Sequence, residues 1–437
     1  MVKRPTLVTN IKQNPADMGR WVADNRAGPA LLLETPLTER TLVATGAHRK
    51  PGAIVLGGTH GSLSVARSLG RRGIPVWLIE TGRSLVGFSR YVEKRLTWAG
   101  PESPGALEWL FALADHHDIG NWLLLPAADP DTRFIAENHA SLASRFRLNT
   151  MPWEILKQAQ DKNLLYKRAA ELGLAFPKSY YPDAASGIPK PERFPVIIKP
   201  TMREDNNPLT AAKAWQADNK AEYERLYSEA RAFLSPEDIV VQEMIPGGGK
   251  TQFSYTGLWN RGQPVASMIV RRTRQYALTF GTGTFVETVD NSEVEKIAVR
   301  LLSSFAYHGL VEAEFKYDER DGLYKVLDVN TRIWTWIGLG EEAGVDFPWL
   351  AWRAEMGDVP EVARGRAGAS WRYLPRDILA GVLEIRSGTT SVGGFLTSLF
   401  RRSAAASFAA DDPLPGLVDL PLVSTRIFRR LISTRRA

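Results

Sequence analysis

The stretch GLVEAEFKYDERDGLYKVLDVNTR, residues 309–332, contains the pattern from which the fold is predicted. Apolar and polar residues alternate on both sides of an acidic turn, which predicts two antiparallel strands joined as a hairpin. The alternation places Glu312 and Glu314 on one face of the first strand, and Asp328 and Asn330 on one face of the second. We expect the hairpin to bring Glu314 opposite Asp328 and Asn330, so that three oxygen ligands converge.

These oxygen ligands indicate a site for a hard metal ion. Carboxylate and amide oxygens suit Mg²⁺, or Mn²⁺ in its place, where the ion also bridges phosphates. The chain contains six His but no Cys. The absence of Cys excludes disulfide scaffolds, iron–sulfur clusters and thiol nucleophiles. Arg332 lies on the same side as Asp328 and Asn330, where it is predicted to clamp a phosphate or a substrate carboxylate. An ion-paired polar sheet face without a ligand is the alternative.

Residues upstream of the hairpin suit a nucleoside triphosphate. Lys162 begins a predicted helix and Lys199 ends a predicted strand, and each is suited to neutralise phosphate oxygens. The strand VVQEMIPGG, residues 240–248, runs into a glycine-rich loop, and its backbone at Glu243 to Ile245 is predicted to bind an adenine edge. The predicted nucleotide-binding residues are therefore Lys162, Lys199, Gln242, Glu243, Met244 and Ile245.

In order and spacing, these features resemble the ATP-grasp superfamily, whose ligases share two lysines, a hinge strand, and a late Glu followed by an E-x-N-x-R stretch. The resemblance covers residues 51 to about 355, and is closest to the branch of the carbamoyl phosphate synthetase large chain and the D-aspartate ligases. It is carried by DKNLL (Lys162), VIIKP (Lys199), QEMIPG (Glu243 and Ile245), AEF (Glu314) and DVNTR (Asp328, Asn330 and Arg332).

The sequence departs from the family's pattern in two places. Asp328 stands where Glu is more usual, which shortens this metal ligand by one methylene. The glycine-rich loop that commonly covers the triphosphate is replaced by TMREDNNPLTAAKAW, residues 201–215. We therefore expect Arg203 or Lys213 to cover the phosphates.

The resemblance implies an α/β protein of the α+β ATP-grasp type, with a parallel pre-ATP-grasp domain followed by two α+β ATP-grasp subdomains. The glycine turn at Gly57, Gly58 and Gly61 follows a short apolar strand and precedes a helix and a second strand, which is typical of a parallel βαβ unit. Its spacing does not match the G-x-G-x-x-G dinucleotide fingerprint. The expected divisions are a lead-in segment (1–50), a pre-ATP-grasp domain (51–150), an ATP-grasp domain (151–355) and a basic C-terminal segment (356–437).

The resemblance also implies a reaction, in which an ATP-dependent carboxylate–amine ligase forms an amide through an acyl phosphate and releases ADP and phosphate. Lys199 is expected to offset developing charge on the phosphates. Arg332, or Arg274 in the basic run RRTRQ, is expected to stabilise the anionic tetrahedral intermediate. The alternatives are a kinase or ligase with a hydroxyl acceptor, a nucleotide-binding scaffold without turnover, and a dinucleotide-dependent oxidoreductase.

The charge of the chain is concentrated near its C-terminal end. The formal net charge is +7, and the stretches GGFLTSLFRR (393–402) and STRIFRRLISTRR (424–436) place apolar residues near arginines at helical spacing. This pattern predicts a peripheral contact with an anionic membrane or an acidic partner protein, with a helix packed on the enzyme body as the alternative. Without a signal-peptide or membrane-span pattern, we expect a cytoplasmic protein that acts on small carboxylates and amines and not on nucleic acid.

Overall fold

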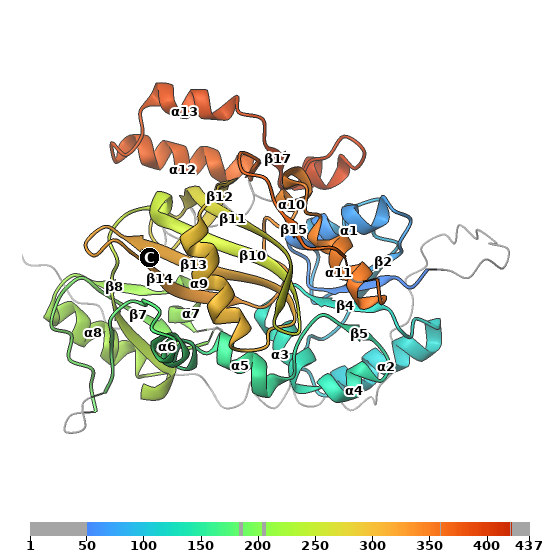
Figure 1. Ribbon diagram of the computed structural model, residues 1–437, viewed down its shortest axis with the longest axis horizontal. Coiled ribbons are helices and arrows are strands. Elements are labelled where there is room, and N and C mark those ends of the chain that lie inside the picture. The colour runs from blue at the N-terminus through green and yellow to red at the C-terminus, as the bar shows by residue number, and fades with distance from the viewer. Residues whose placement is uncertain (1–49, 183–186, 203–206, 359, 420, 422–437) are drawn as a thin grey trace, which may run out of the picture. The chain divides into compact units, whose positions relative to one another are not determined.

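The computed structural model describes residues 50–182, 187–202, 207–358, 360–419 and 421 (Figure 1). Residues 1–49 of the predicted lead-in segment, Arg203 and the basic stretch 424–436 lie outside these residues. The residues from Lys50 onward form one compact unit. No helix in the described ranges combines the length and the apolar character that a bilayer crossing requires.

The first part of this unit is a parallel sheet with helices on its faces, as the βαβ pattern predicts. The strand order is β3-β2-β1-β4-β5, and all four pairings are parallel. The central strands are short apolar runs whose residues are buried, as expected for a sheet covered on both faces. The elements are β1 (Ala53–Leu56), α1 (His60–Gly70), β2 (Val76–Glu80), β3 (Lys94–Thr97), α2 (Ala106–His117), β4 (Leu123–Pro126), α3 (Asp129–Glu137), α4 (His139–Ala143) and β5 (Arg147–Leu148).

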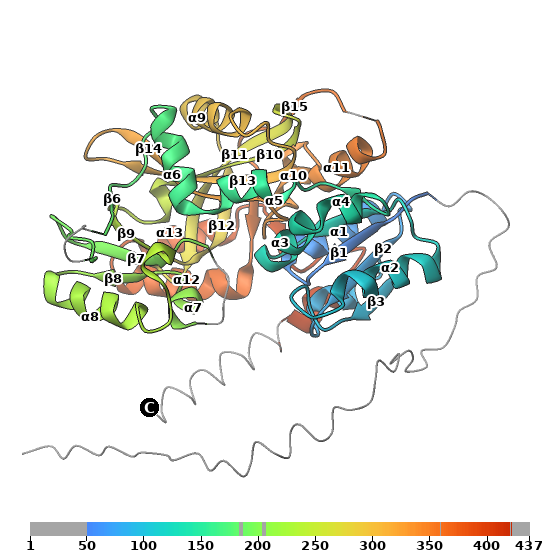
Figure 2. The same cartoon turned by 90° about the horizontal axis from the view of Figure 1, so that it is seen from below.

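A helical pair and a small antiparallel sheet follow. In this sheet the strand order is β6-β9-β7-β8, and Figure 2 shows α8 beside β8 and β7. The elements are α5 (Trp153–Gln160), α6 (Lys162–Glu171), β6 (Ser179–Tyr180), β7 (Val196–Pro200), α7 (Pro208–Ala212), β8 (Trp215–Ala217), α8 (Lys220–Ala230) and β9 (Ile239–Glu243).

The third part is a larger sheet with the strand order β14-β13-β10-β11-β12-β16-β17, and β15 pairs with β11. Its strands are β10 (Gln252–Asn260), β11 (Gln263–Tyr276), β12 (Thr282–Thr288), β13 (Gly309–Asp318), β14 (Leu323–Asn330), β15 (Ala363–Arg364), β16 (Ser370–Arg372) and β17 (Ala404–Ala405). Its helices are α9 (Ser292–Ser303), α10 (Leu339–Ala343), α11 (Phe347–Glu355), α12 (Leu374–Arg386) and α13 (Val392–Leu399).

The large sheet continues beyond residue 355, where the sequence analysis placed a domain boundary. The pairing of β16 with β12, and of β17 with β16, adds residues of the C-terminal segment to the sheet. These strands have two or three residues each, so they carry no alternation from which a strand is predicted. The C-terminal segment is therefore built into the same sheet as the predicted ATP-grasp domain up to Ala405.

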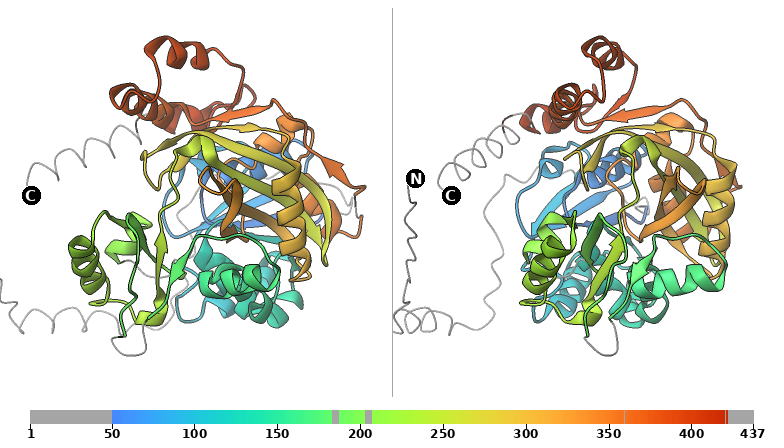
Figure 3. Two further views of the ribbon diagram at one scale, coloured as in Figure 1. Left: turned by 60° about the vertical axis from the view of Figure 1, so that its left-hand side comes forward. Right: turned by 90° about the vertical axis from the view of Figure 1, so that its left-hand side faces the viewer.

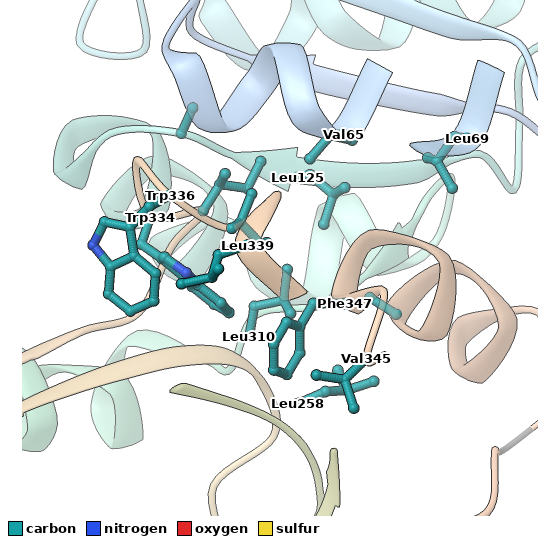
Figure 4. Close-up of a cluster of buried hydrophobic side chains, with 14 of the residues drawn as sticks. Val65, Leu69, Leu125, Leu258, Leu310, Trp334, Trp336, Leu339, Val345 and Phe347 are labelled. Atoms are coloured by element: carbon teal, nitrogen blue, oxygen red, sulfur yellow. The ribbon is translucent and has the colours of Figure 1, made fainter. Parts of the chain in front are cut away.

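One apolar core joins the parallel domain to the large sheet (Figure 4). Side chains from α1 and β4 meet side chains from β10, β13 and the segment after β14 in this cluster. Trp334 and Phe347 are fully buried at its centre, and their rings lie 5.2 Å apart edge to face. The core fixes the segment that follows Arg332 against the parallel domain, and so it positions the end of β14.

Asp131, in the first turn of α3, is a buried carboxyl group whose titration should affect stability. It is 6% exposed, and burial raises its pKa to about 7. Because the folded state then holds a proton that the unfolded state releases near its ordinary pKa of 3.8, the free energy of unfolding should fall as the pH rises from about 4 to about 7. Asp131→Asn should flatten this dependence in melting curves. An equally steep dependence in the variant would assign it to another group.

Candidate active site

A cavity of about 350 Å³ lies between the small sheet and the large sheet. This volume is within the range of small-molecule sites. The cavity is lined by residues of β7, β9, β13 and β14, by the hinge after β9, and by residues 278–283. A smaller pocket beside α3 shares Lys162, Asp328 and Asn330 with it. The predicted site residues therefore meet at one hollow surface, with the exception of Arg274.

The hairpin of β13 and β14 has the predicted register. Glu314 lies opposite Asp328, and Glu312 lies opposite Asn330. The side-chain amide of Asn330 donates to Glu312 Oε2 at 3.1 Å and to Glu314 Oε1 at 3.2 Å. The predicted pairing of Glu314 with Asp328 is confirmed, whereas Asn330 pairs with Glu312 and reaches Glu314 through its side-chain amide.

The charges around this hairpin favour a bound cation. Glu312 is buried, and its pKa is raised to about 7 by burial and by the neighbouring carboxylate of Glu314. Arg272 Nη2 lies 2.7 Å from Glu314 Oε1 and partly compensates that charge. In the described ranges, no three His, Cys, Asp or Glu side chains are gathered as a metal site. Two carboxylates and an amide still fit Mg²⁺, because this ion keeps water and phosphate oxygens among its ligands.

Both predicted lysines reach the cavity from buried positions. Asp161 caps α6 by accepting from the amides of Asn163 and Leu164, which fixes the helix start at Lys162. Lys162 Nζ donates to the carbonyl oxygen of Thr201 at 3.1 Å and lies 3.5 Å from Asp328 Oδ1.

Lys199, near the end of β7, donates from Nζ to the hydroxyl oxygen of Tyr166 at 2.9 Å. Burial raises the pKa of Tyr166, which keeps this hydroxyl neutral. The two lysines therefore place two positive charges at the wall of the cavity near the acidic hairpin.

The backbone amides of the hinge after β9 are only partly used within the protein. The amides of Glu243 and Met244 already donate to the carbonyl oxygens of Lys178 and Pro195. Among the described residues, the amide of Ile245 has no hydrogen-bond partner.

The side chains of β9 at the hinge are tied to the protein itself. Gln242 is fully buried and donates to Ser179 Oγ. Glu243 accepts from Lys325 and Arg320. For an adenine edge, the hinge thus offers its backbone and the apolar Met244 and Ile245, which line the cavity.

Arg332 lines the cavity and forms an ion pair with Asp129, with Nε 2.6 Å from Oδ1. The Nη2 atom of Arg332 also lies 3.5 Å from Asn330 Oδ1. Since Asp129 begins α3, this pair connects the parallel domain to the end of β14. This position agrees with the predicted role of Arg332, which is to meet a phosphate or a substrate carboxylate beside Asp328 and Asn330.

The structure does not bring Arg274 to the cavity, and this prediction needs correction. Its guanidinium makes two hydrogen bonds to Asp377 of α12, at 2.8 and 2.9 Å, and both side chains are buried. The pairing of β11 with β12 shifts register between Arg272 and Arg274, so simple alternation fails there. Arg272 is the arginine of this run that lines the cavity, and Gln275 lines it as well.

Arg274→Lys should therefore reduce stability and not catalysis. Lysine keeps the charge but loses the two-pronged bond to Asp377, which should lower the free energy of unfolding by about 1–3 kcal/mol. Denaturant unfolding measures this loss, and ATP turnover at low temperature is the control. A large fall in turnover without a change in stability would show that Arg274 acts in catalysis, as first predicted.

The segment that replaces the glycine-rich loop contributes to the wall of the cavity. Lys213 Nζ donates to Thr282 Oγ1 at 2.9 Å, and both residues line the cavity. Lys213 is thus well placed for the predicted role, whereas Arg203 lies outside the described residues. Residues 278–281 also line the cavity, and no periodic pattern in the sequence predicted this loop.

The glycine turn serves packing in this structure. A Cβ atom on Gly58 would meet the carboxylate of Glu80, and one on Gly61 would lie 2.4 Å from the carbonyl oxygen of Trp334. Glu80, at the end of β2, is 4% exposed and pairs with Arg95 at 2.5 Å. The turn is closed by protein atoms, which argues against a dinucleotide at this position.

Comparison with known proteins agrees with this geometry. The family described as "ATP-grasp in the biosynthetic pathway with Ter operon" matches residues 237–375. The D-aspartate ligase of Enterococcus faecium is 20% identical over 223 residues, which are 48% of this chain and 53% of that protein. The chain thus aligns with about half the length of this curated relative.

Two solved structures share the fold. The L-amino acid ligase of Bacillus licheniformis superposes with a TM-score of 0.56 at 16% identity, covering 74% of this chain and 79% of that one. The biotin carboxylase domain of the Hydrogenobacter thermophilus 2-oxoglutarate carboxylase, in complex with MgADP, gives 0.57 at 16% identity, covering 73% of each chain. The chain thus has an ATP-grasp family match over residues 237–375 and a fold that fits the ATP-grasp type.

Proposed function

We propose that this protein is an ATP-dependent carboxylate–amine ligase that forms an amide and releases ADP and phosphate. The observation that carries the proposal is the convergence, in one cavity, of two buried lysines with Glu314, Asp328 and Asn330. Such a set of cations and hard oxygen ligands suits a triphosphate with its metal ion. The names of the two ligases to which the chain is similar support the reaction class.

The nucleotide has one favourable orientation in the cavity. The unpaired amide of Ile245 is a donor for a ring nitrogen of adenine, and Met244 offers an apolar contact. Lys199 would then bind oxygens in the middle of the triphosphate. The γ-phosphate would lie nearest to Lys162 and Asp328, which are themselves 3.5 Å apart.

The proposed reaction has two steps. A carboxylate oxygen of the first substrate attacks the γ-phosphorus, the bond to the β-phosphate oxygen breaks, and ADP leaves. An amine then attacks the acyl carbon, loses a proton, and displaces phosphate with its bridging oxygen. When bound, Mg²⁺ neutralises phosphate charge and aligns the reacting oxygens.

Two arginines would serve the acyl side of the site. Arg332 and Arg272 both line the cavity and both already contact carboxylates of the protein, Asp129 and Glu314. A substrate carboxylate or a tetrahedral oxyanion can replace such a partner at similar distance. The acceptor region is thus proposed to lie between β11, the end of β14 and α3.

The test is to identify the products with pooled substrates. The full chain should be incubated with ATP, Mg²⁺ and sets of L- and D-amino acids. Both kinds are included because one similar ligase is named for D-aspartate and the other for L-amino acids. We expect ADP and phosphate in a carboxylate-dependent reaction, and a hydroxamate when hydroxylamine replaces the amine. AMP and pyrophosphate would indicate an adenylating enzyme, and ADP without phosphate would indicate a kinase with a hydroxyl acceptor.

A further inference from the structure

Exposed apolar side chains are concentrated in the C-terminal part of the described chain. Among the seventeen large hydrophobic residues that are exposed in the described ranges, nine lie between residues 374 and 417. Scattered exposed apolar residues are normal on a soluble protein, whereas a concentration of them marks an interaction surface. The nine are Leu374, Ile378, Val382, Val392, Leu396, Phe400, Phe408, Leu414 and Leu417.

Six of these residues form stripes on two helices, which we call the α12–α13 face. Along α12 they recur every four residues from Leu374 to Val382. Along α13 and its C-cap residue they recur every four residues from Val392 to Phe400. This spacing places each set on one side of its helix. Phe400 is 89% exposed, an unusually high value for this side chain.

The opposite side of α12 is already used for packing. Asp377 is fully buried against Arg274 of β11, and Phe395 of α13 packs against Gly381. Figure 3 shows α13 outside α12, on the side away from the strands of the large sheet. The apolar stripes therefore remain exposed, although both helices also pack against the rest of the protein.

The exposed charges on this segment are all positive. Between residues 374 and 402, the two acids, Asp377 and Glu384, are buried, whereas Arg386, Arg401 and Arg402 are exposed. Arg401 pairs with Glu287 at 2.5 Å. In the part of the chain that the structure describes, Arg386 and Arg402 have no carboxylate partner.

We propose that the α12–α13 face binds peripherally to the surface of an anionic phospholipid bilayer. Apolar side chains flanked by unpaired arginines are the combination that such a surface attracts, because the apolar groups enter the interface while the cations meet the lipid phosphates. A second copy of the chain fits less well, since a twofold contact would bring the same arginines against each other.

The experiment is co-sedimentation of the full chain with vesicles. Wild-type protein should bind vesicles that contain phosphatidylglycerol, bind pure phosphatidylcholine weakly, and dissociate in high salt. The double variant Leu396→Ser/Phe400→Ser should lower the partition coefficient about tenfold or more. The charge reversals Arg386→Glu and Arg402→Glu should weaken binding to the anionic vesicles only.

The matched control is Leu323→Ser, which alters a residue of similar exposure at the far turn of β14 and should bind like wild type. Residues 424–436 remain in every variant, so their contribution does not change. Wild-type binding by the Leu396/Phe400 variant would overturn the proposal. Two other results would also overturn it. One is a wild-type dimer that the Leu396/Phe400 variant fails to form, and the other is a fall in the melting temperature of the variant by more than a few degrees. Either result would mean that the α12–α13 face is covered by protein.

Discussion

Replacing Lys199 by Met is expected to reduce carboxylate-dependent ADP formation about 10³-fold, equivalent to about 4 kcal/mol of transition-state stabilisation. Methionine nearly preserves the length of the side chain but removes the charge that would meet the phosphates. Lys199 lies near the end of a short strand, and its Nζ atom lies 2.9 Å from the hydroxyl oxygen of Tyr166. The main effect of the substitution is therefore the loss of the positive charge. Steady-state turnover and ATP binding, measured on the same preparation, separate a catalytic defect from a binding defect.

Lys220→Met is the matched control for this prediction. Lys220 lies at the start of α8 with a side chain that is 80% exposed, and its replacement should leave turnover unchanged. Melting curves of both variants should remain close to that of the wild type. Near-normal turnover in Lys199→Met would remove this lysine from the proposed active site.

Replacing Asp328 by Asn should lower turnover by 10²-fold or more, because the variant loses one negative ligand charge with little change in shape. The structure adds a reason: Asp328 also lies 3.5 Å from Lys162, so the change leaves a buried cation with less compensation. Titration of activity with Mg²⁺ should show a weaker apparent affinity as well as a lower maximum.

Asp328→Glu provides the control, since Glu is the more usual residue at the matching position of the superfamily. We expect this variant to retain most of the wild-type activity. If Asp328→Asn reached wild-type turnover at saturating Mg²⁺, or if both substitutions were equally damaging, Asp328 would not be a metal ligand.

Local patterns predicted the parts of the site that depend on strand alternation. The hairpin register follows from period-two spacing, and a single acidic turn joins two clear strands. The parallel sheet was predictable from a different pattern, since its central strands are short continuous apolar runs separated by a glycine turn and helices. The predicted helix start at Lys162 is also found, and Asp161 caps it.

The failures have physical causes that local sequence does not contain. Arg274 was misplaced because the register shift after Arg272 depends on the pairing of β11 with β12. The extension of the large sheet by β16 and β17 depends on contacts between residues far apart in the chain. The ion pair of Arg332 with Asp129 likewise joins residues about 200 positions apart, and no spacing rule predicts it.

The central claim is that a carboxylate oxygen attacks the γ-phosphorus of ATP, and transfer of ¹⁸O tests it most directly. Once a carboxylate substrate has been found, it should be supplied with both carboxylate oxygens labelled, and the phosphate released should be analysed by mass spectrometry. An acyl phosphate intermediate predicts one ¹⁸O atom in each phosphate and none in ADP. Label in AMP, or unlabelled phosphate during amide formation, would contradict the account.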